Sequence, residues 1–180
     1  SSPRVWWLFK TMGFTNIAVL DGGLPAWEKA KLPVEKKQTQ DVELGNFKAS
    51  FEPKKLIDSE TVLESVKNRS KQIVDARSKG RFNATELEPR KEIRSGHIPT
   101  STNLPYTSIL NNFELKTKEE LLQLYQQVNP DTKEMIFSCG SGITACVLAL
   151  GATIAGYEEV AVYDGSWTEW GSLTHLPIEK

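Results

Sequence analysis

The sequence of 180 residues contains only two cysteines and two histidines. Two cysteines cannot build a disulfide framework, which favours a reducing compartment: the cytoplasm or, as the alternative, the mitochondrial matrix. These four residues lie far apart in the sequence, so no tetrahedral metal site is predicted. We expect neither a metal nor an organic cofactor.

The sequence also lacks long apolar runs and an excess of one charge. No run approaches the ~18 residues of a membrane span and no signal peptide opens the chain, so we expect no membrane partner. The 22 Lys and Arg residues against 23 Asp and Glu residues give a formal net charge of −1. Because no basic block is present, no nucleic-acid partner is expected. The remaining composition, 39% apolar and 25% charged, is typical of a globular domain with a buried core.

Two segments of the chain resemble each other, one from Gly13 (GFTNIAVLDGGLPAWEKAKLPVE) and one from Gly156 (GYEEVAVYDGSWTEWGSLTHLPIE). The matching residues keep one offset: Gly13 with Gly156, Phe14 with Tyr157, Val19 with Val162, Asp21 with Asp164, Gly22 with Gly165, and Trp27 with Trp170. One insertion then aligns Leu32-Pro33 with Leu176-Pro177. So many matches in the same order indicate a duplication.

The repeat predicts how the chain is organised. Residues 1–35 are expected to be the C-terminal remnant of a first domain, residues 36–55 a polar linker, and residues 56–180 a complete catalytic domain. The missing segment of the first domain is then an expected partner of this chain. The alternative is a short N-terminal arm that has evolved to look like such a remnant.

The predicted catalytic domain alternates short apolar strands with helices. Strands are expected over 72–75, 101–104, 134–138 and 160–163, and helices after a cap at Ser59, over 118–128 and over 142–156. Such alternation predicts an α/β fold, an open parallel sheet with helices on both faces. Ligands bind outside the carboxyl ends of the strands in such sheets. Cys139 follows the 134–138 strand at that position.

Cys139 begins a turn that contains two glycines, Gly140 and Gly142. Glycines allow successive backbone N–H groups to turn toward one point, and the next helix adds its positive end. A thiolate is stabilised there, so Cys139 is predicted to be a nucleophile. The alternative is a small buried cysteine at a strand end. Cys146 lies two turns into an apolar helix and is expected in the core, too far for a disulfide with Cys139.

Two residues of the loop argue against phosphoryl chemistry. A tyrosine phosphatase would need an arginine six residues after the cysteine, where this chain has Ala145. A Walker loop would need a lysine before Thr144, and Ile143 stands there instead.

Four motifs together resemble the rhodanese superfamily of sulfurtransferases, in its two-domain form. They are CGSGITA from Cys139, SGHIPTSTNLP from Ser95, VDAR from Val74 and YDGSWTEW from Tyr163. The uncharged Gly140-Ser141-Gly142 turn is similar to the branch whose sulfur donor is 3-mercaptopyruvate, whereas the thiosulfate branch carries basic residues there. The resemblance implies a rhodanese-like fold over residues 56–180.

The resemblance also implies roles for individual residues. Cys139 matches the cysteine that holds the transferred sulfur as a persulfide, and Ser141 matches a serine that assists proton movement or binds a substrate oxygen. Arg81 and Arg90 match the arginines that bind the donor's carboxylate and carbonyl, for which a guanidinium fork is suited. The loop residues expected to bind substrate are Gly140, Gly142, Ile143 and Thr144. The expected partners are a small-molecule sulfur donor and a thiol acceptor such as thioredoxin.

Other expectations concern residues around the site. Asp75 and Arg77 are expected to brace the loop through salt bridges, and His97 to satisfy loop hydrogen bonds. In the family, a histidine and an aspartate of the first domain approach the cleft, and their segment precedes Ser1. Two alternative functions stay open: a thiosulfate:cyanide sulfurtransferase, and a non-catalytic rhodanese-like interaction or redox module.

Overall fold

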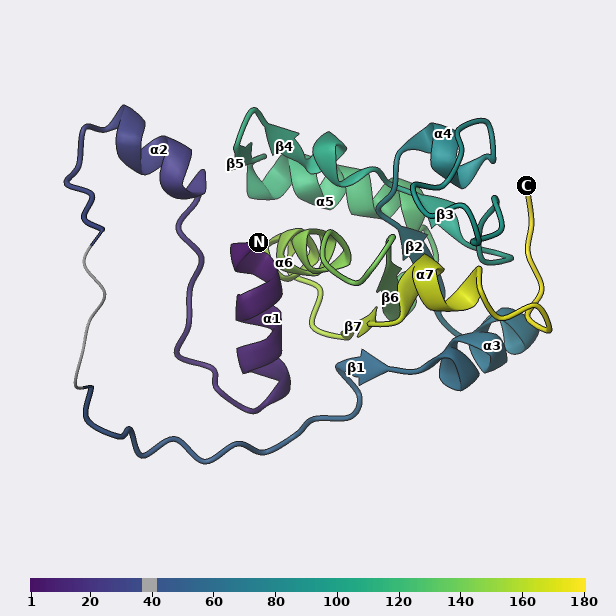
Figure 1. The fold of residues 1–180 in the computed structure, drawn as a ribbon, viewed down its shortest axis with the longest axis horizontal. Helices are drawn as coiled ribbons and strands as arrows, with labels where there is room; N and C mark the ends of the chain where they lie inside the picture. The colour runs from purple at the N-terminus through teal and green to yellow at the C-terminus, as the bar shows by residue number, and fades with distance from the viewer. Residues whose placement is uncertain (37–41) are drawn as a thin grey trace.

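The computed structural model describes residues 1–36 and 42–180, and its centre is a five-stranded parallel sheet (Figure 1). The strands in spatial order are β1 (Leu56–Ile57), β7 (Val160–Tyr163), β6 (Met135–Ser138), β2 (Gln72–Asp75) and β3 (Thr102–Asn103). Parallel neighbours need crossover connections, and helices provide them here. The predicted strands 72–75 and 160–163 are confirmed to the residue, and the other two are shorter than predicted.

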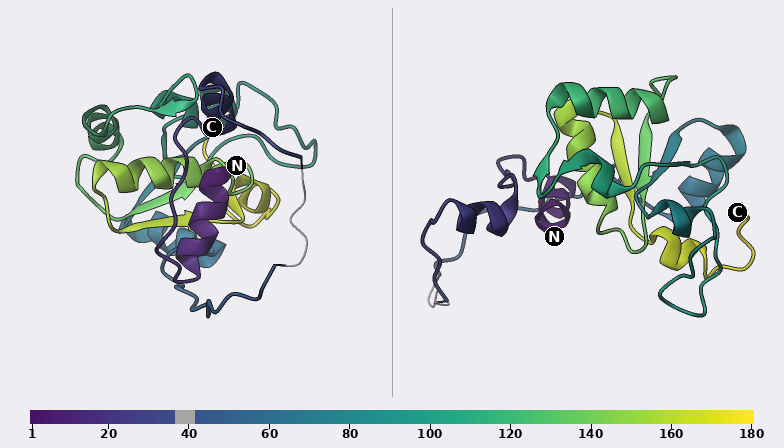
Figure 2. Two further views of the ribbon diagram at one scale, coloured as in Figure 1. Left: turned by 90° about the vertical axis from the view of Figure 1, so that its left-hand side faces the viewer. Right: turned by 90° about the horizontal axis from the view of Figure 1, so that it is seen from above.

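Helices cover both faces of the sheet (Figure 2). One face carries α1 (Ser2–Thr11), α5 (Lys118–Val128) and α6 (Ala145–Ala155), and the other carries α3 (Ser59–Asn68) and α7 (Ser166–Trp170). Successive strand residues enter opposite clusters: Phe137 and Val162 pack with α6, whereas Ile136 and Tyr163 pack with α7. This period-two alternation fits a sheet buried on both sides, so the predicted α/β fold is confirmed.

Side chains cap the N-termini of helices α5 and α3. At α5, Thr117 and Glu120 form a capping box, as the Thr-x-x-Glu spacing favours. At α3 the predicted cap at Ser59 is wrong. Asp58 is the cap, and its carboxylate accepts the backbone N–H of Thr61 at 2.9 Å, so Ser59 is already helical.

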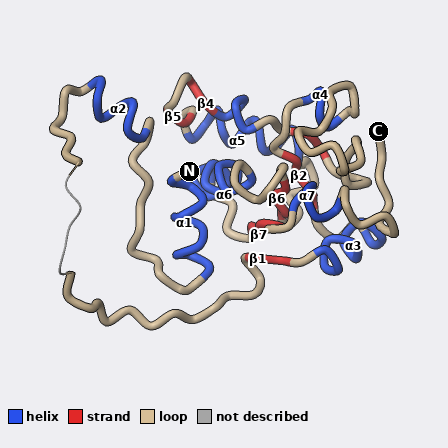
Figure 3. The backbone as a smooth tube through the Cα atoms, viewed as in Figure 1, coloured by secondary structure: helices blue, strands red, loops and turns tan. Residues whose placement is uncertain are grey.

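Several short elements were not predicted (Figure 3). They are α2 (Gly23–Lys29), α4 (Lys79–Phe82), the 3-10 helix η1 (Tyr106–Ile109), and the hairpin of β4 (Leu110–Asn111) and β5 (Glu114–Leu115). Each is too short for hydrophobic periodicity to reveal it. Among the described residues, no helix is long and apolar enough to cross a membrane.

The two segments that resemble each other in sequence also share local structure. Trp27 donates its indole N–H to the carbonyl of Pro33 at 2.9 Å, and Trp170 donates to Pro177 at 2.7 Å. Gly13 and Gly156 both adopt positive φ, 83° and 101°, just after α1 and α6. The segments differ at their strands, because residues 17–20 form none whereas their counterparts form β7.

The N-terminal segment is built into the body of the predicted catalytic domain. Helix α1 lies against α6, and the side chains of Trp6 and Trp7 are buried in the same cluster as Phe137. Of the predicted linker, residues 37–41 lie outside the described residues. Residues 42–50 are exposed and return to the end of α1, where Ser50 donates to the carbonyl of Met12 at 2.9 Å.

Candidate active site at the Cys139 loop

The last residue of β6 is Ser138, and Cys139 follows at the carboxyl edge of the sheet, as predicted. The four residues of β6 are all buried between the two helical layers, which fixes where the strand ends. Cys139 itself is 1% exposed, and both cysteines are free thiols. Cys146 lies fully buried in α6, so its predicted place in the core is confirmed.

Ser166, which the sequence analysis missed, holds the turn closed. Its hydroxyl oxygen accepts the N–H of Cys139 at 3.0 Å and the N–H of Gly142 at 3.1 Å. The hydroxyl donates to the carbonyl of Tyr163 at 2.8 Å, so its hydrogen is turned away from the Cys139 sulfur, 4.0 Å distant. Ser166 has φ 50°, a left-handed conformation that costs a side-chain-bearing residue about 1–3 kcal/mol. The repeat offered a signal, because its counterpart Gly23 has φ 58°.

The loop presents backbone N–H groups that can stabilise an anion. In the described part of the chain, no acceptor lies within hydrogen-bonding distance of the N–H groups of Gly140, Ser141, Ile143 and Thr144. These groups precede the N-terminus of α6, where the helix dipole favours negative charge. A thiolate or persulfide at Cys139 fits such a turn.

The loop side chains that were predicted to take part in catalysis or substrate binding point away from the core. Ser141 is exposed, Ile143 is 45% exposed, and Thr144 is half-buried. No hydrogen bond fixes the Ser141 hydroxyl among the residues that the structure describes. The structure therefore places these side chains at the surface of the turn, and their roles in catalysis and binding stay predictions.

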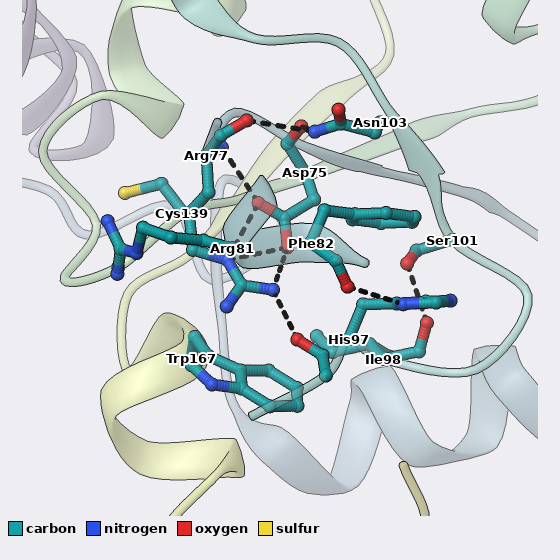
Figure 4. A network of polar contacts seen from close by, with 12 residues as sticks. Asp75, Arg77, Arg81, Phe82, His97, Ile98, Ser101, Asn103, Cys139 and Trp167 are labelled. Atoms are coloured by element: carbon teal, nitrogen blue, oxygen red, sulfur yellow. Dashed lines mark hydrogen bonds and ion pairs between the residues drawn. The ribbon is translucent and has the colours of Figure 1, made fainter. Parts of the chain in front are cut away.

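A buried ion-pair network stands next to the loop (Figure 4). Arg77 pairs with Asp75 at 2.7 Å and with Glu88 at 2.8 Å, so the predicted bracing role of Arg77 and Asp75 is confirmed. The carboxylate of Glu88 also forms an ion pair with Arg81, whose Nη2 lies 2.6 Å from Glu88 Oε2. Glu88 was not identified from the sequence, although it is the acid that links the two arginines. Its side chain is 4% exposed and that of Arg81 25%.

Arg81 lies directly beside Gly140, the residue after Cys139, and Arg90 is linked to Gly140 through Thr168. A Cβ atom added to Gly140 would lie 3.2 Å from Arg81 Nη2. Arg90 donates from Nη1 to the Thr168 hydroxyl at 2.9 Å, and this hydroxyl donates to the carbonyl of Gly140 at 2.6 Å. The structure thus brings both arginines to one side of the loop. Their substrate-binding role stays a prediction.

The contacts of His97 and Cys146 give these two residues structural roles rather than roles among the reacting groups. The ring of His97 stacks on Phe82 with centroids 3.8 Å apart and its Nδ1 lies 2.9 Å from the Phe82 carbonyl, as the predicted structural role requires. Burial raises the pKa of Cys146 to about 11, and its S–H points to the carbonyl of Gly142 at 3.1 Å. Cys146 is therefore a thiol at neutral pH.

In the described part of the chain, neither a metal site nor the apolar cavity competes with the Cys139 loop as the candidate functional site. In residues 1–36 and 42–180, no group of three or more His, Cys, Asp or Glu side chains could hold a metal ion. An apolar cavity of about 370 Å³ lies between residues 19–25 and helix α6, and no residue of the turn 139–146 lines it. The chemistry-bearing groups converge at Cys139 instead.

A match to the profile of the rhodanese-like domain covers residues 58–173. The chain belongs to the rhodanese family.

Within the family, the chain is similar to named sulfurtransferases. It is 42% identical over 172 residues to 3-mercaptopyruvate sulfurtransferase of Mus musculus, covering 94% of this chain and 58% of that protein. It is 39% identical over 171 residues to thiosulfate sulfurtransferase of Gallus gallus, again covering 94% of this chain and 58% of that protein. The crystal structure of the 3-mercaptopyruvate sulfotransferase SseA of Escherichia coli superposes with a TM-score of 0.79 at 36% identity, covering 93% of this chain and 62% of that one. The chain thus spans about three fifths of these relatives.

Proposed function

We propose that this chain carries the sulfur-transfer site of a 3-mercaptopyruvate sulfurtransferase. The observation that carries the proposal is the turn at Cys139, in which four backbone N–H groups make no hydrogen bond within the described chain, with Arg81 beside Gly140 and Arg90 linked to Gly140 through Thr168. A nucleophilic sulfur, an anion-stabilising turn and nearby guanidinium groups are what transfer from a 2-oxo acid thiol requires. The similarity to 3-mercaptopyruvate sulfurtransferases supports this donor.

In the first step, the Cys139 thiolate attacks the thiol sulfur of 3-mercaptopyruvate. An S–S bond forms as the C–S bond breaks, the electron pair leaves on pyruvate as its enolate, and the enolate takes up a proton. The donor's hydrogen remains on the outer sulfur of the Cys139 persulfide. Arg81 and Arg90 hold the 2-oxo carboxylate and so align the sulfur with the nucleophile, and Ser141 assists the proton transfer.

In the second step, an acceptor removes the outer sulfur and restores the Cys139 thiolate. The acceptor is a thiol such as that of thioredoxin, or cyanide, which becomes thiocyanate. The turn amides stabilise negative charge on the sulfur in both steps, so neither a metal nor an organic cofactor is needed.

Intact-mass spectrometry after mixing with donor tests the proposal directly. The wild-type chain and a Cys146→Ala control are expected to gain the mass of one sulfur atom, whereas Cys139→Ser is expected to gain none. An adduct on Cys139→Ser would refute Cys139 as the carrier. If no variant gains sulfur from any donor, the non-catalytic module becomes the better interpretation.

The second candidate is a thiosulfate:cyanide sulfurtransferase, which the similarity to the Gallus gallus enzyme favours. Persulfide formation with thiosulfate and with 3-mercaptopyruvate should be measured side by side. We expect faster loading from 3-mercaptopyruvate, because the turn itself carries no cation for sulfonate oxygens. Faster loading from thiosulfate would overturn the donor assignment.

The carboxylate role of Arg90 has its own test. Arg90→Gln removes the charge and is expected to raise KM for 3-mercaptopyruvate about tenfold or more, since a charge-assisted hydrogen bond contributes about 1.5–3 kcal/mol. Lys91→Gln, one residue away and also exposed, is the matched control and should leave KM unchanged. Equal KM values for the two variants would contradict the role of Arg90.

The same proposal covers the organisation of the whole protein. Residues 1–35 are the end of a first rhodanese-like unit, a tandem repeat supported by the shared Trp-to-Pro hydrogen bonds and glycine conformations. The rest of that unit is a partner of the site. The scarcity of cysteine favours a reducing location, the cytoplasm or the mitochondrial matrix.

A further inference from the structure

A guanidinium group from helix α1 reaches the turn that carries Cys139. Arg4 Nη1 forms an ion pair with Asp164 Oδ1 and lies 3.4 Å from the carbonyl of Gly142. Asp164 follows the last residue of β7, whereas Arg4 lies in the first turns of α1. The contact therefore joins the N-terminal segment to the candidate active site across 138 positions of sequence.

Burial in the core holds α1 in place. Trp6, Trp7 and Thr11 of this helix are all buried, and the Thr11 hydroxyl donates to the Trp7 carbonyl. The buried face packs on α6, the helix that begins just after the Cys139 loop. Arg4 thus extends from a fixed position, with its side chain 23% exposed.

The Arg4–Asp164 pair packs directly against Gly142. Gly142 has φ 74°, and a Cβ atom added there would lie 2.8 Å from both the carbonyl oxygen and Oδ1 of Asp164 and 3.1 Å from Arg4 Nη1. The N–H of Gly142 is bound by Ser166, which also binds the N–H of Cys139. The pair is therefore linked to the nucleophile through two residues, Gly142 and Ser166.

The charges of the pair matter because the turn must hold negative charge. The Asp164 carboxylate places a negative charge against Gly142 of this turn, and Arg4 offsets that charge. The other cations that face the turn are Arg81 and Arg90, both on the side of Gly140. Among the described residues, Arg4 is the cation on the Gly142 side, where the remaining titratable group is the Cys146 thiol.

We infer that Arg4 is a positioning residue for the Cys139 loop. It holds the left-handed turn at Gly142 and offsets the charge of Asp164, so a helix of the N-terminal segment forms part of the reactive site. As a statement about sulfur transfer this inference rests on the proposed function. The reactivity of the Cys139 thiolate, however, can be measured without any sulfur donor.

The test is the rate at which iodoacetamide alkylates Cys139 in the 180-residue chain, located by peptide mass spectrometry and followed from pH 6 to 10. Arg4→Met keeps an unbranched apolar stem and removes the guanidinium charge. We expect its rate at neutral pH to fall about tenfold and its pH profile to move to higher pH, because the Asp164 charge at the turn is then uncompensated. Lys10→Met, a cation lost from the same helix, should leave rate and profile unchanged.

A double variant separates charge from packing. Asp164→Asn combined with Arg4→Met removes both charges and is expected to recover the rate to within about threefold of wild type. Melting temperatures identify variants that fail to fold. If Arg4→Met fails to fold, Arg4→Lys is measured in its place; because it keeps the cation, it should retain the wild-type pH profile. A folded Arg4→Met chain with the wild-type profile overturns the inference, as does a double variant as slow as Arg4→Met.

Failure here is distinguishable from failure of the proposed function. If Cys139 takes no sulfur from any donor but the alkylation profiles shift as expected, Arg4 still positions the loop and only the sulfurtransferase assignment is lost. If sulfur is transferred but the profiles do not shift, the role of Arg4 is refuted.

Discussion

Replacing Glu88 with glutamine should destabilise the fold markedly, because this buried acid links two arginines. Glu88 accepts Arg77 Nη1 at 2.8 Å, Arg81 Nη2 at 2.6 Å and Arg81 Nε at 3.2 Å. A glutamine amide offers one acceptor oxygen and one NH₂ group, so an N–H donor would face a guanidinium donor. The change also leaves Arg77, 1% exposed, with Asp75 as its remaining carboxylate partner.

The magnitude follows from the burial of each partner. Breaking a buried ion pair by removing one charge costs about 3–5 kcal/mol. The Arg81 contact is partly exposed and is screened, so it adds only about 0–1 kcal/mol. We therefore expect Glu88→Gln to lower the free energy of unfolding by about 3 kcal/mol, and the melting temperature by about 6–12 °C for a chain of this size.

Urea denaturation measures the effect, with an unchanged m-value as the sign that only stability has changed. Glu86→Gln is the matched control, because Glu86 is exposed and accepts only the Ser78 hydroxyl, at 2.8 Å. It should change stability by no more than about 0.5 kcal/mol. A loss below about 1 kcal/mol in Glu88→Gln would show that the network does not hold the 77–88 region, and the reasoning would be wrong.

Two further predictions follow from the caps and from burial. Because burial raises the pKa of Cys146 to about 11, Cys146 should stay unalkylated in the native chain at pH 8 and react only in denaturant; rapid labelling of Cys146 in the native chain would contradict this. Asp58→Ala should cost about 1 kcal/mol whereas Ser59→Ala costs little, as urea titrations can show. The backbone N–H of Thr61 lowers the pKa of Asp58, so the cap's contribution is complete above the ordinary carboxylate range and is lost as pH falls through the folded-state pKa.

The sequence was sufficient for elements whose signals are local. Helix α5 was predicted to the residue from its amphipathic period, and β7 from its short apolar run. Elements of two to five residues, such as β1 and α7, carry no period, and their formation depends on packing against the rest of the sheet.

The candidate site likewise contains residues that a local sequence signal identifies and residues that it does not. Cys139 and its glycines could be identified because their signal is local: an apolar strand followed by a flexible turn. The residues that hold this turn act across long stretches of chain, Ser166 over 24 positions and Arg4 over 138. Neither residue carries a local signal of its own: the repeat, which pairs Ser166 with Gly23, hints at Ser166, and Arg4 is revealed by the fold.

The three arginines around the turn differ in how much positive charge they can offer a substrate. Arg81 is paired with Glu88, and Arg4 with Asp164, so each is largely neutralised by an acid of its own. Arg90 donates to the neutral Thr168 hydroxyl, and no carboxylate of the described chain lies within ion-pair distance of it. If the two arginines hold the donor's carboxylate as proposed, Arg90 therefore offers it the larger uncompensated charge, whereas the charge of Arg81 is shared with Glu88.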